Sequence, residues 1–370
     1  MSKASINDPI MKQTAQAWLA KLISFDTRNG TGDEVLLARY LSEQLQGFNP
    51  DTLICEMVPR SRGKTKSAFV FARWGTPRIL LNVHIDTVPS GEGWKSDPLK
   101  LRDEGDKLIG LGSSDIKGAA AAILAALGTT TPNNVAILFS GDEEHGSEVM
   151  PAFIGSGLLE GISTAIVCEP TGCEVGRRHR GMLAFSTSFS GPGGHSSLSD
   201  HVAAPLLQAS RLASAIGDYG DLHREFGEDP YKGLCINIGE IIGDGAYNVI
   251  PTKVDFKFSM RPPPGDSVSQ RETDIRAIAA KAMEPIKLDT IVAFPSFETK
   301  DVKAFEPYFG PFAAIDLPYW TEAAMLSNAG VNTVVYGPGD VEQAHRPNEY
   351  VTLTQLHKAQ NTYKRALRGD

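Results

Sequence analysis

Four short apolar runs mark the 370-residue chain. They are ILLNV at 79–83, VAILF at 135–139, TAIVC at 164–168 and TVVY at 333–336. Continuous apolar runs of this length are typical of strands buried on both faces of a parallel sheet. Between the first two runs lies DIKGAAAAILAAL, which predicts a crossover helix starting at Asp115. The alternation predicts an α/β fold with a mostly parallel sheet and helices on both faces.

Two amphipathic helices are predicted ahead of these strands. Asp8 and Pro9 form a capping pair, with proline at the first helical position, and apolar residues follow at helical spacing: Trp18, Leu19, Leu22 and Ile23. The second helix is expected from about Asp33 to Gln46, ending at Gly47. Both helices are amphipathic, with apolar residues at helical spacing.

The hydrophobic pattern changes in a central segment. KVDFKFSM at 253–260 places Phe256, Phe258 and Met260 on one face and polar side chains on the other, and LAFSTSF at 183–189 alternates in the same way. A strand with this period of two has one face in water.

Further elements complete this segment. Helices are expected at about 201–216 and 267–283, and strands at about 233–241 and 286–294. The resulting order, βαββαβ, predicts a ferredoxin-like unit. We therefore expect a first domain of residues 1–177 and 296–370 and an inserted domain of residues 178–295.

Composition narrows the class of protein. With 41% hydrophobic and 22% charged residues and a net charge of -8, the chain reads as an acidic globular protein, so we expect neither nucleic-acid nor membrane binding. Its cysteines form no C-x-x-C pair, which favours reduced thiols: Cys55, Cys168, Cys173 and Cys235. The start of the chain lacks a signal-peptide pattern, and GAAAAILAAL at 118–127 is too short to span a bilayer, so we expect a cytoplasmic location.

Polar residues that suit chemistry follow the four apolar runs. They are His84 and Asp86, then Glu143 and Glu144, then Glu169, and finally His345, with Asp115 at the start of the crossover helix. Singly, each has an ordinary explanation as a local hydrogen bond, an N-cap, a turn or a solvated loop residue. Together they are expected to meet at one sheet edge, beyond the carboxyl ends of the strands. Two histidines with three carboxylates suit zinc or cobalt better than calcium or magnesium.

The motifs resemble those of the co-catalytic di-zinc family of aminoacylases, carboxypeptidases and deacylases. HIDTVP, GLGSSDIKG, SGDEEHGS, Glu169-Pro170 and GPGGHSS carry the resemblance, which covers nearly the whole chain. WTEAAM at 320–325 and YGPGDVEQAHRPNEYV at 336–351 resemble the acetylornithine deacetylase branch. Most of the wider family has an acidic Gly-Thr-Asp or Ser-Asp element where this chain has Thr321 and Glu322. That departure favours the branch and leaves the role of Glu322, a candidate substrate-binding residue, open.

The resemblance implies two divalent metal ions, zinc or cobalt. Asp115 would bridge them. His84 and Glu169 would complete one site, and Glu144 and His345 the other.

Three further residues receive roles by the same resemblance. Asp86 would orient the His84 ring, and Glu143 would be the general base. His195 in GPGGHSS would donate to the oxyanion from a partner subunit, which implies a homodimer whose inserted domain serves as dimerisation and lid domain.

Substrate binding needs a group that holds a free carboxylate. Arg261, at the end of the strand 253–260, offers a planar fork, and Asn248 resembles the family's companion residue. A solvated strand-end charge is the alternative for Arg261. GRRHRG at 176–181 contributes a basic cluster, Arg177, Arg178 and Arg180, whose role the sequence leaves open.

The resemblance implies an N-acyl-L-amino-acid amidohydrolase of arginine biosynthesis. N-acetyl-L-citrulline is the favoured substrate, with N-acetyl-L-ornithine or a broader set of N-acyl amino acids as alternatives. A non-catalytic binding protein on the same fold is the alternative of another class, although every candidate ligand is present. A serine hydrolase would need G-x-S-x-G and a nicotinamide enzyme G-x-G-x-x-G after a strand, and the chain has neither.

Overall fold

The computed structural model describes residues 13–60, 66–282 and 287–369. The chain divides into two compact units. The first comprises residues 1–177, 299–317 and 321–370, and the second comprises residues 178–298 and 318–320. Among the described residues, every helix is too short or too polar to cross a membrane.

A nine-stranded sheet forms the centre of the first unit. Its order is β1-β2-β6-β3-β7-β17-β8-β15, with β16 on β8. The strands are β1 (Thr52–Pro59), β2 (Lys66–Trp74), β3 (Ile79–His84), β6 (Val135–Ser140), β7 (Thr164–Val167), β8 (Val175–His179), β15 (Phe297–Glu298), β16 (Ala314–Asp316) and β17 (Asn332–Val335). The four central strands, β6, β3, β7 and β17, pair in parallel, whereas β1, β2, β8 and β15 pair antiparallel. The predicted parallel sheet is confirmed, with antiparallel strands at its flanks.

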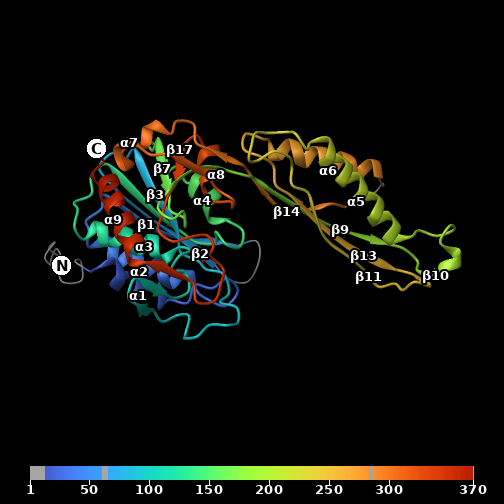
Figure 1. The fold of residues 1–370 in the computed structure, drawn as a ribbon, viewed down its shortest axis with the longest axis horizontal. Helices are drawn as coiled ribbons and strands as arrows, with labels where there is room; N and C mark the ends of the chain where they lie inside the picture. The colour runs from blue at the N-terminus through green and yellow to red at the C-terminus, as the bar shows by residue number, and fades with distance from the viewer. Residues whose placement is uncertain (1–12, 61–65, 283–286, 370) are drawn as a thin grey trace. The chain divides into compact units, whose positions relative to one another are not determined.

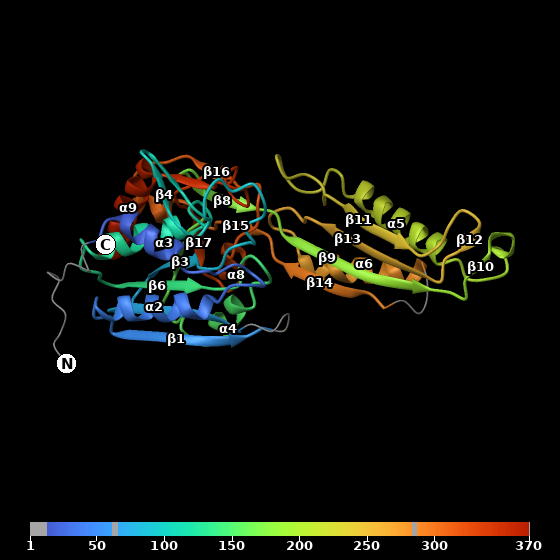
Figure 2. The ribbon, with the colours of Figure 1, turned by 90° about the horizontal axis from the view of Figure 1, so that it is seen from below.

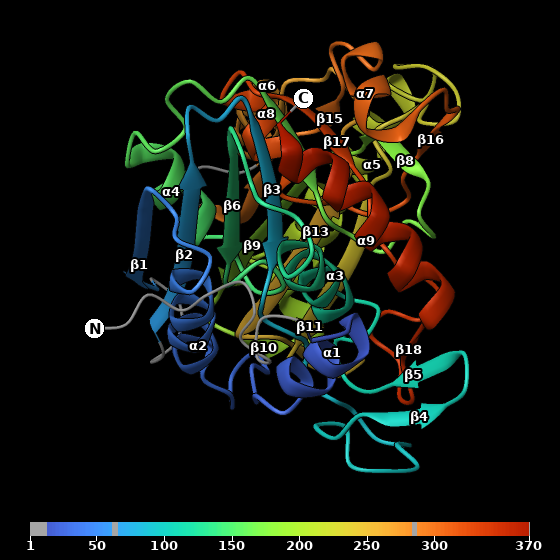
Figure 3. The same cartoon turned by 90° about the vertical axis from the view of Figure 1, so that its left-hand side faces the viewer.

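Helices cover both faces of this sheet, as strands buried on both faces require. On one face, Ala68, Val70 and Ala72 of β2 share a core with α1 (Ala15–Ile23), α2 (Glu34–Gln46), α3 (Lys117–Leu127) and α9 (Leu353–Arg368). Figure 3 shows these four helices in front of the strands. On the other face, Phe69 and Phe71 contact Phe153 of α4 (Val149–Gly155), each with ring centroids 5.5 Å apart.

Shorter elements complete the first unit. They are β4 (Arg102–Glu104), β5 (Lys107–Ile109) and β18 (Tyr350–Thr352), which form a three-stranded sheet, with η3 (Lys303–Phe305), α7 (Glu306–Phe309) and α8 (Ala323–Asn328).

Helix starts differ from the sequence prediction at two places. The predicted cap at Asp8 and Pro9 lies outside the described residues, and α1 begins at Ala15, where the Thr14 side chain accepts from the Ala17 N–H. The crossover helix begins at Lys117 rather than Asp115. Asp115 instead belongs to the preceding loop, where its N–H donates to the Glu349 carboxylate over 2.8 Å.

The second unit is ferredoxin-like, as predicted. Its order is β9 (Met182–Ser190), α5 (Pro205–Leu222), β11 (Asn237–Gly243), β13 (Lys253–Met260), α6 (Val268–Ala282) and β14 (Asp289–Phe294). The strands lie side by side as β11-β13-β9-β14, all antiparallel (Figure 2). Figure 1 shows α5 and α6 along one face of this sheet. Between the main elements, β10 (Gly194–His195) pairs with β12 (Val249–Ile250), and η2 (Ser196–Leu198) follows β10.

Side-chain alternation in this unit also matches the prediction. Phe256, Phe258 and Met260 are buried in a core with α5 and α6, while Lys253 and Lys257 are exposed. The predicted starts of α5 and β11 were four residues early. Pro205 sets the first turn of α5, a position that proline favours.

The basic cluster of the sequence has structural partners. Arg178 and Arg180 both lie over the Tyr231 ring, 5.7 and 5.3 Å from its centroid. Arg178 donates to the Asp229 carbonyl and Arg180 to that of Lys232, each over 2.9 Å. These two arginines therefore hold a loop of the second unit, and Arg177 pairs with Asp316 in the first.

Candidate functional site

The polar residues predicted to meet do so at one edge of the sheet in the first unit. The central strands run parallel in the order β6, β3, β7 and β17, so their carboxyl ends lie together. Glu143 and Glu144 follow β6, and His84 is the last residue of β3. Glu169 follows β7, and His345 follows β17. Asp115 reaches the same place from the loop before α3.

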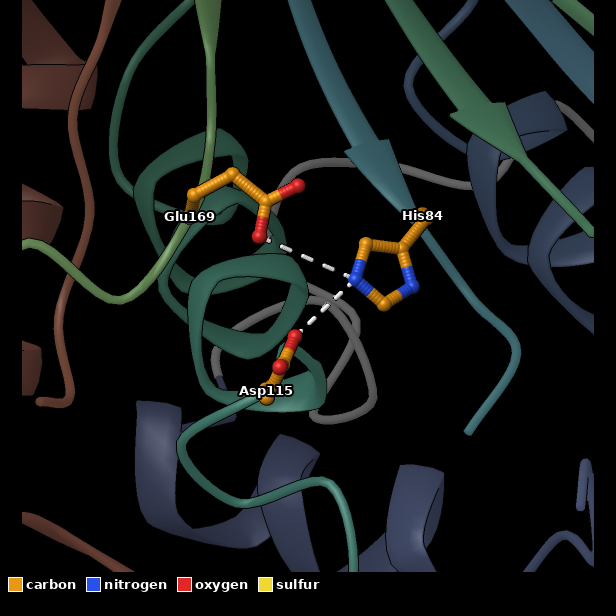
Figure 4. A group of neighbouring side chains, drawn as sticks. All are labelled: His84, Asp115 and Glu169. Carbon is orange, nitrogen blue, oxygen red and sulfur yellow. Dashed lines mark hydrogen bonds and ion pairs between the residues drawn. The ribbon is translucent and has the colours of Figure 1, made fainter. Parts of the chain in front are cut away.

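His84, Asp115 and Glu169 form the first group of possible metal ligands (Figure 4). His84 Nε2 lies 3.0 Å from Asp115 Oδ1 and 3.8 Å from Glu169 Oε2. The buried ring would lose its charge in isolation, but Glu169, Asp115 and Asp86 raise the pKa of His84 well above its ordinary value. Figure 4 shows the imidazole of β3 directed between the two carboxylates.

Asp115, Glu144 and His345 form the second group. His345 Nε2 lies 2.9 Å from Glu144 Oε1 and 3.4 Å from Asp115 Oδ2. Hydrogen bonds to Asp115 and Glu144 raise the pKa of His345 to about 10. Asp115 therefore belongs to both groups, with Oδ1 directed to one histidine and Oδ2 to the other. Within each group one ligand atom per residue lies within 4.8 Å of the others.

Asp86 is buried beneath His84 and is anchored on several sides. The His84 ring places Nδ1 3.2 Å from the Asp86 carbonyl oxygen and 3.4 Å from Oδ1. The Asp86 carboxylate accepts the backbone N–H groups of Glu143 and Glu144 over 3.0 and 3.1 Å. It also accepts from Asn29 Nδ2 over 3.0 Å. Asp86 thus fixes a histidine and the neighbouring loop together; sequence reasoning missed Asn29, whose turn-like context gives no sign of this contact.

Glu143 and Glu144 are adjacent, yet their carboxylates have different surroundings. The Glu144 carboxylate lies against His345. Within the described part of the chain, the Glu143 carboxylate has no hydrogen-bond partner. Burial and the negative charges of Glu169, Glu144 and Glu322 raise the pKa of Glu143 well above its ordinary value. Such a carboxylate is suited to accept a proton at neutral pH.

The donor set fits two divalent cations. The two groups contain three carboxylates and two histidines, and Glu143 lies close to them. Burial and neighbouring carboxylates raise the pKa values of Glu143, Glu144 and Glu169, because so many acidic groups disfavour one another's charged forms. Such a concentration of carboxylates is stabilised when cations occupy it. Imidazole nitrogen together with carboxylate oxygen is the ligand combination that zinc and related ions accept.

Glu322 lies in the same unit, before α8. Its side chain is buried and accepts from Ser140 Oγ over 2.7 Å. Burial raises the pKa of Glu322 to about 7. Its contact with substrate stays a prediction, and the structure shows it packed against the end of β6.

The three remaining predicted residues lie in the second unit. His195 is in β10 and Asn248 immediately precedes β12. The structure brings these two together, because β10 pairs with β12 and the Ser196 N–H donates to the Asn248 carbonyl over 3.2 Å. Both side chains are exposed. Arg261 follows the opposite end of β13.

Anion binding by Arg261 stays a prediction. It is half-buried, and burial lowers the pKa of its guanidinium. In the described residues, its side chain makes no hydrogen bond or ion pair, unlike Arg178 and Arg271 of the same unit. A partly buried guanidinium without a carboxylate partner is stabilised when a ligand supplies one.

Comparisons with known proteins agree with this geometry. The model of peptidase family M20/M25/M40 matches residues 80–369. Among solved structures, an M20 family metallo-carboxypeptidase from Sulfolobus solfataricus superposes with a TM-score of 0.74 at 16% identity, covering 96% of this chain and 98% of that one. A dinuclear metal binding peptidase of the M20 family from Bacillus subtilis gives a TM-score of 0.66 at 15% identity, covering 97% and 98%. At these identities the superpositions establish the fold.

Curated relatives share more of the sequence. The chain is 35% identical to the N-acetyl-L-citrulline deacetylase of Xanthomonas campestris pv. campestris, over 95% of this chain and 96% of that protein. It is 30% identical to the acetylornithine deacetylase of Photorhabdus laumondii subsp. laumondii, over 86% and 85%. With a family model that spans most of the sequence and relatives of matching length, the chain belongs to peptidase family M20/M25/M40.

Proposed function

We propose that this protein is a metal-dependent deacetylase of N-acetylated amino acids, with N-acetyl-L-citrulline as its preferred substrate. One observation carries the proposal: two groups of possible metal ligands share Asp115, and close to them the Glu143 carboxylate has no hydrogen-bond partner among the described residues. The products would be citrulline and acetate. The names of the two deacetylase relatives support this substrate class.

The two ligand groups would hold the two divalent ions. His84 and Glu169 would bind one, Glu144 and His345 the other, and Asp115 would bind both. Zinc or cobalt is favoured by the mixture of imidazole and carboxylate ligands. When bound, such ions polarise an amide carbonyl and lower the pKa of water.

Glu143 would move the proton. As the water oxygen forms its bond to the acetyl carbon, the Glu143 carboxylate takes a proton from that water. As the bond between that carbon and nitrogen breaks, Glu143 delivers the proton to the departing amine. The raised pKa of Glu143 supports this role, as do its carboxylate oxygens, which accept no hydrogen bond from any residue that the structure describes.

The second unit would hold the amino-acid portion of the substrate. Arg261 would bind the α-carboxylate through two parallel hydrogen bonds. His195 would donate to the oxyanion that forms as water attacks. Asn248, which lies beside His195, would contact the substrate at the same place.

These residues cannot all serve one substrate molecule from one chain. Asn248 lies before the start of β13 and Arg261 after its end. Eight residues of strand span roughly 25 Å, far more than the length of an acetylated amino acid. If both groups act on one substrate, they come from different subunits, and we infer a homodimer in which His195 and Asn248 belong to the partner.

The surface of the second unit supports this dimer. Of the eleven large apolar side chains exposed in the described residues, nine lie in this unit. Ile238 and Ile242 lie on β11, the edge strand of its sheet, and Val249 lies on β12 beside His195. An exposed apolar edge strand is a surface for association, and a second copy would cover it.

A product assay tests the proposed function. Metal-free protein, checked by elemental analysis, should be inactive and should regain activity with zinc or cobalt. The reloaded protein should then be given acetylcitrulline, acetylornithine, acetylmethionine and succinyl-diaminopimelate, with release of the free amine as the readout. We expect the highest kcat/KM for acetylcitrulline. Full activity of the verified metal-free protein would overturn the metal-dependent reaction, and a clear preference for acetylornithine would reassign the substrate.

A further inference from the structure

Glu349 is a buried carboxylate that none of the proposed roles uses. Its residue is 2% exposed and directly precedes β18, four positions after His345. Sequence reasoning did not single it out. A carboxylate is rarely so deeply buried unless its oxygens are fully hydrogen-bonded.

The side chain of Glu349 accepts three backbone N–H groups from one loop. Oε2 accepts from Gly112 over 2.9 Å, and Oε1 accepts from Ser114 and Asp115, each over 2.8 Å. No other acceptor for these three N–H groups occurs within the ranges that the structure describes. Buried N–H groups need acceptors, so the loop depends on this carboxylate for its conformation.

The main chain of Glu349 is bound to the same loop. Its carbonyl accepts from the Gly110 N–H over 3.0 Å and from Ser113 Oγ over 3.1 Å. Gly112 has a φ of +77°, and a Cβ at this position would lie 2.8 Å from Thr87 Cγ2. Residues 110–115 therefore form a tight turn around Glu349. This turn can adopt few other conformations.

This turn ends at the residue shared by both ligand groups. Its last N–H belongs to Asp115, whose two oxygens face His84 and His345. Glu349 also lies in the segment that carries His345, whose side chain is 52% exposed. By contrast, His84 and Glu169 are buried at the ends of β3 and β7 and have support that is independent of Glu349.

We propose that Glu349 is a positioning residue that joins the Asp115 turn to the His345 segment and thereby sets the geometry of the Asp115–Glu144–His345 ligand group. The inference rests on the proposed metal centre. Because the other group keeps two strand-supported ligands, loss of Glu349 affects the second ion more than the first.

Metal titration of Glu349→Gln tests the proposal. Glutamine keeps nearly the same size, but its amide nitrogen places a donor against a backbone N–H. Zinc would be titrated calorimetrically into metal-free wild-type and variant proteins, with stoichiometry checked by elemental analysis after dialysis. We expect wild type to bind two ions. We expect one of the two ions to bind about 10- to 100-fold less tightly in the variant, the usual consequence of losing a residue that orients ligands, and the other to bind nearly as well as in wild type.

Asp266→Asn is the matched control. Asp266 is also a buried carboxylate, but it pairs with Arg271 in the second unit. This substitution should lower the melting temperature and leave both zinc affinities unchanged. If Glu349→Gln behaves in the same way, or weakens both ions equally, the proposal is overturned.

Ser113→Ala provides a milder variant in case Glu349→Gln fails to fold. It removes only the bond from Ser113 Oγ to the Glu349 carbonyl, and we expect a few-fold weaker second ion with the first unchanged. An unchanged second ion in this variant would count against the proposal. If wild type binds fewer than two ions, the proposed metal centre itself is overturned. If Glu349→Gln binds both ions as tightly as wild type does, only the role of Glu349 is overturned.

Discussion

The two units of this chain build sheets with different surroundings. In the first, β3 and β6 are buried at every position, and the candidate site lies beyond the strand ends. In the second, β13 alternates between buried and exposed residues, and β11 forms an edge with Ile238 and Ile242 exposed. A sheet covered on both faces offers its strand ends for chemistry, because its faces are occupied. A sheet with one free face and a free edge offers a surface for association.

The proposed mechanism makes this contrast testable, because each unit would contribute what the other lacks. The first would supply metal ligands and the proton carrier Glu143. The second would supply the substrate anchor Arg261 and, across a dimer, His195. Substitutions in the two units should therefore fail in different ways.

The largest effect is expected at Glu143. Glu143→Ala should reduce kcat by a factor on the order of 10² to 10⁴, the usual contribution of a proton-transfer group, with little change in zinc content. Glu144→Ala is the neighbouring control. It should lower zinc content, because it removes a carboxylate that contacts His345 and is proposed to bind the metal. Zinc and kcat would be measured on the same preparations. The reverse pattern of zinc loss would exchange the two assignments.

His195 tests whether the second unit acts across subunits. His195→Ala should lower kcat by about 10² to 10³, as for other oxyanion donors. When this variant is mixed with Glu143→Ala and the subunits exchange, each mixed dimer regains one intact site. Activity should approach about a quarter of the wild-type value per subunit for statistical exchange in a two-fold dimer. No recovery in verified mixed dimers would mean that His195 acts within its own chain or outside catalysis.

The exposed edge of the second unit should control association. Ile242 is 61% exposed, and Ile242→Lys should weaken the dimer on the order of 10²-fold, since a two-fold interface loses the same apolar contact twice. Leu36 on α2 is 54% exposed in the first unit and provides the matched control. Sedimentation across a concentration series would measure both variants. Equal dimerisation of Ile242→Lys and Leu36→Lys would mean that β11 does not take part in the interface.

Arg261 should give the smallest of these effects. Arg261→Lys keeps the charge but loses the planar fork, so we expect KM to rise about tenfold with kcat nearly unchanged. A substrate whose α-carboxylate is amidated should bind wild type and variant almost equally. If the amidated substrate still distinguished the two proteins, Arg261 would contact another part of the substrate.

Local sequence pattern was sufficient for much of this structure. Continuous apolar runs predicted the four central strands, and strict alternation predicted β13 with Phe256 and Phe258 inward. Parallel neighbours share one carboxyl edge, so the residues after the runs could be expected to meet. Each of these inferences depends on residues that are close in the sequence or on a general rule of sheet topology.

Only the tertiary structure decided the remaining features. The helix after Asp115 begins at Lys117, two residues later than its composition suggests, and the Asp115 N–H donates to Glu349, 234 positions away. No periodicity signals a hydrogen bond at that separation, nor the one between Asn29 and Asp86. Sequence patterns determined which elements form, and packing between distant segments determined which side chains they bring together.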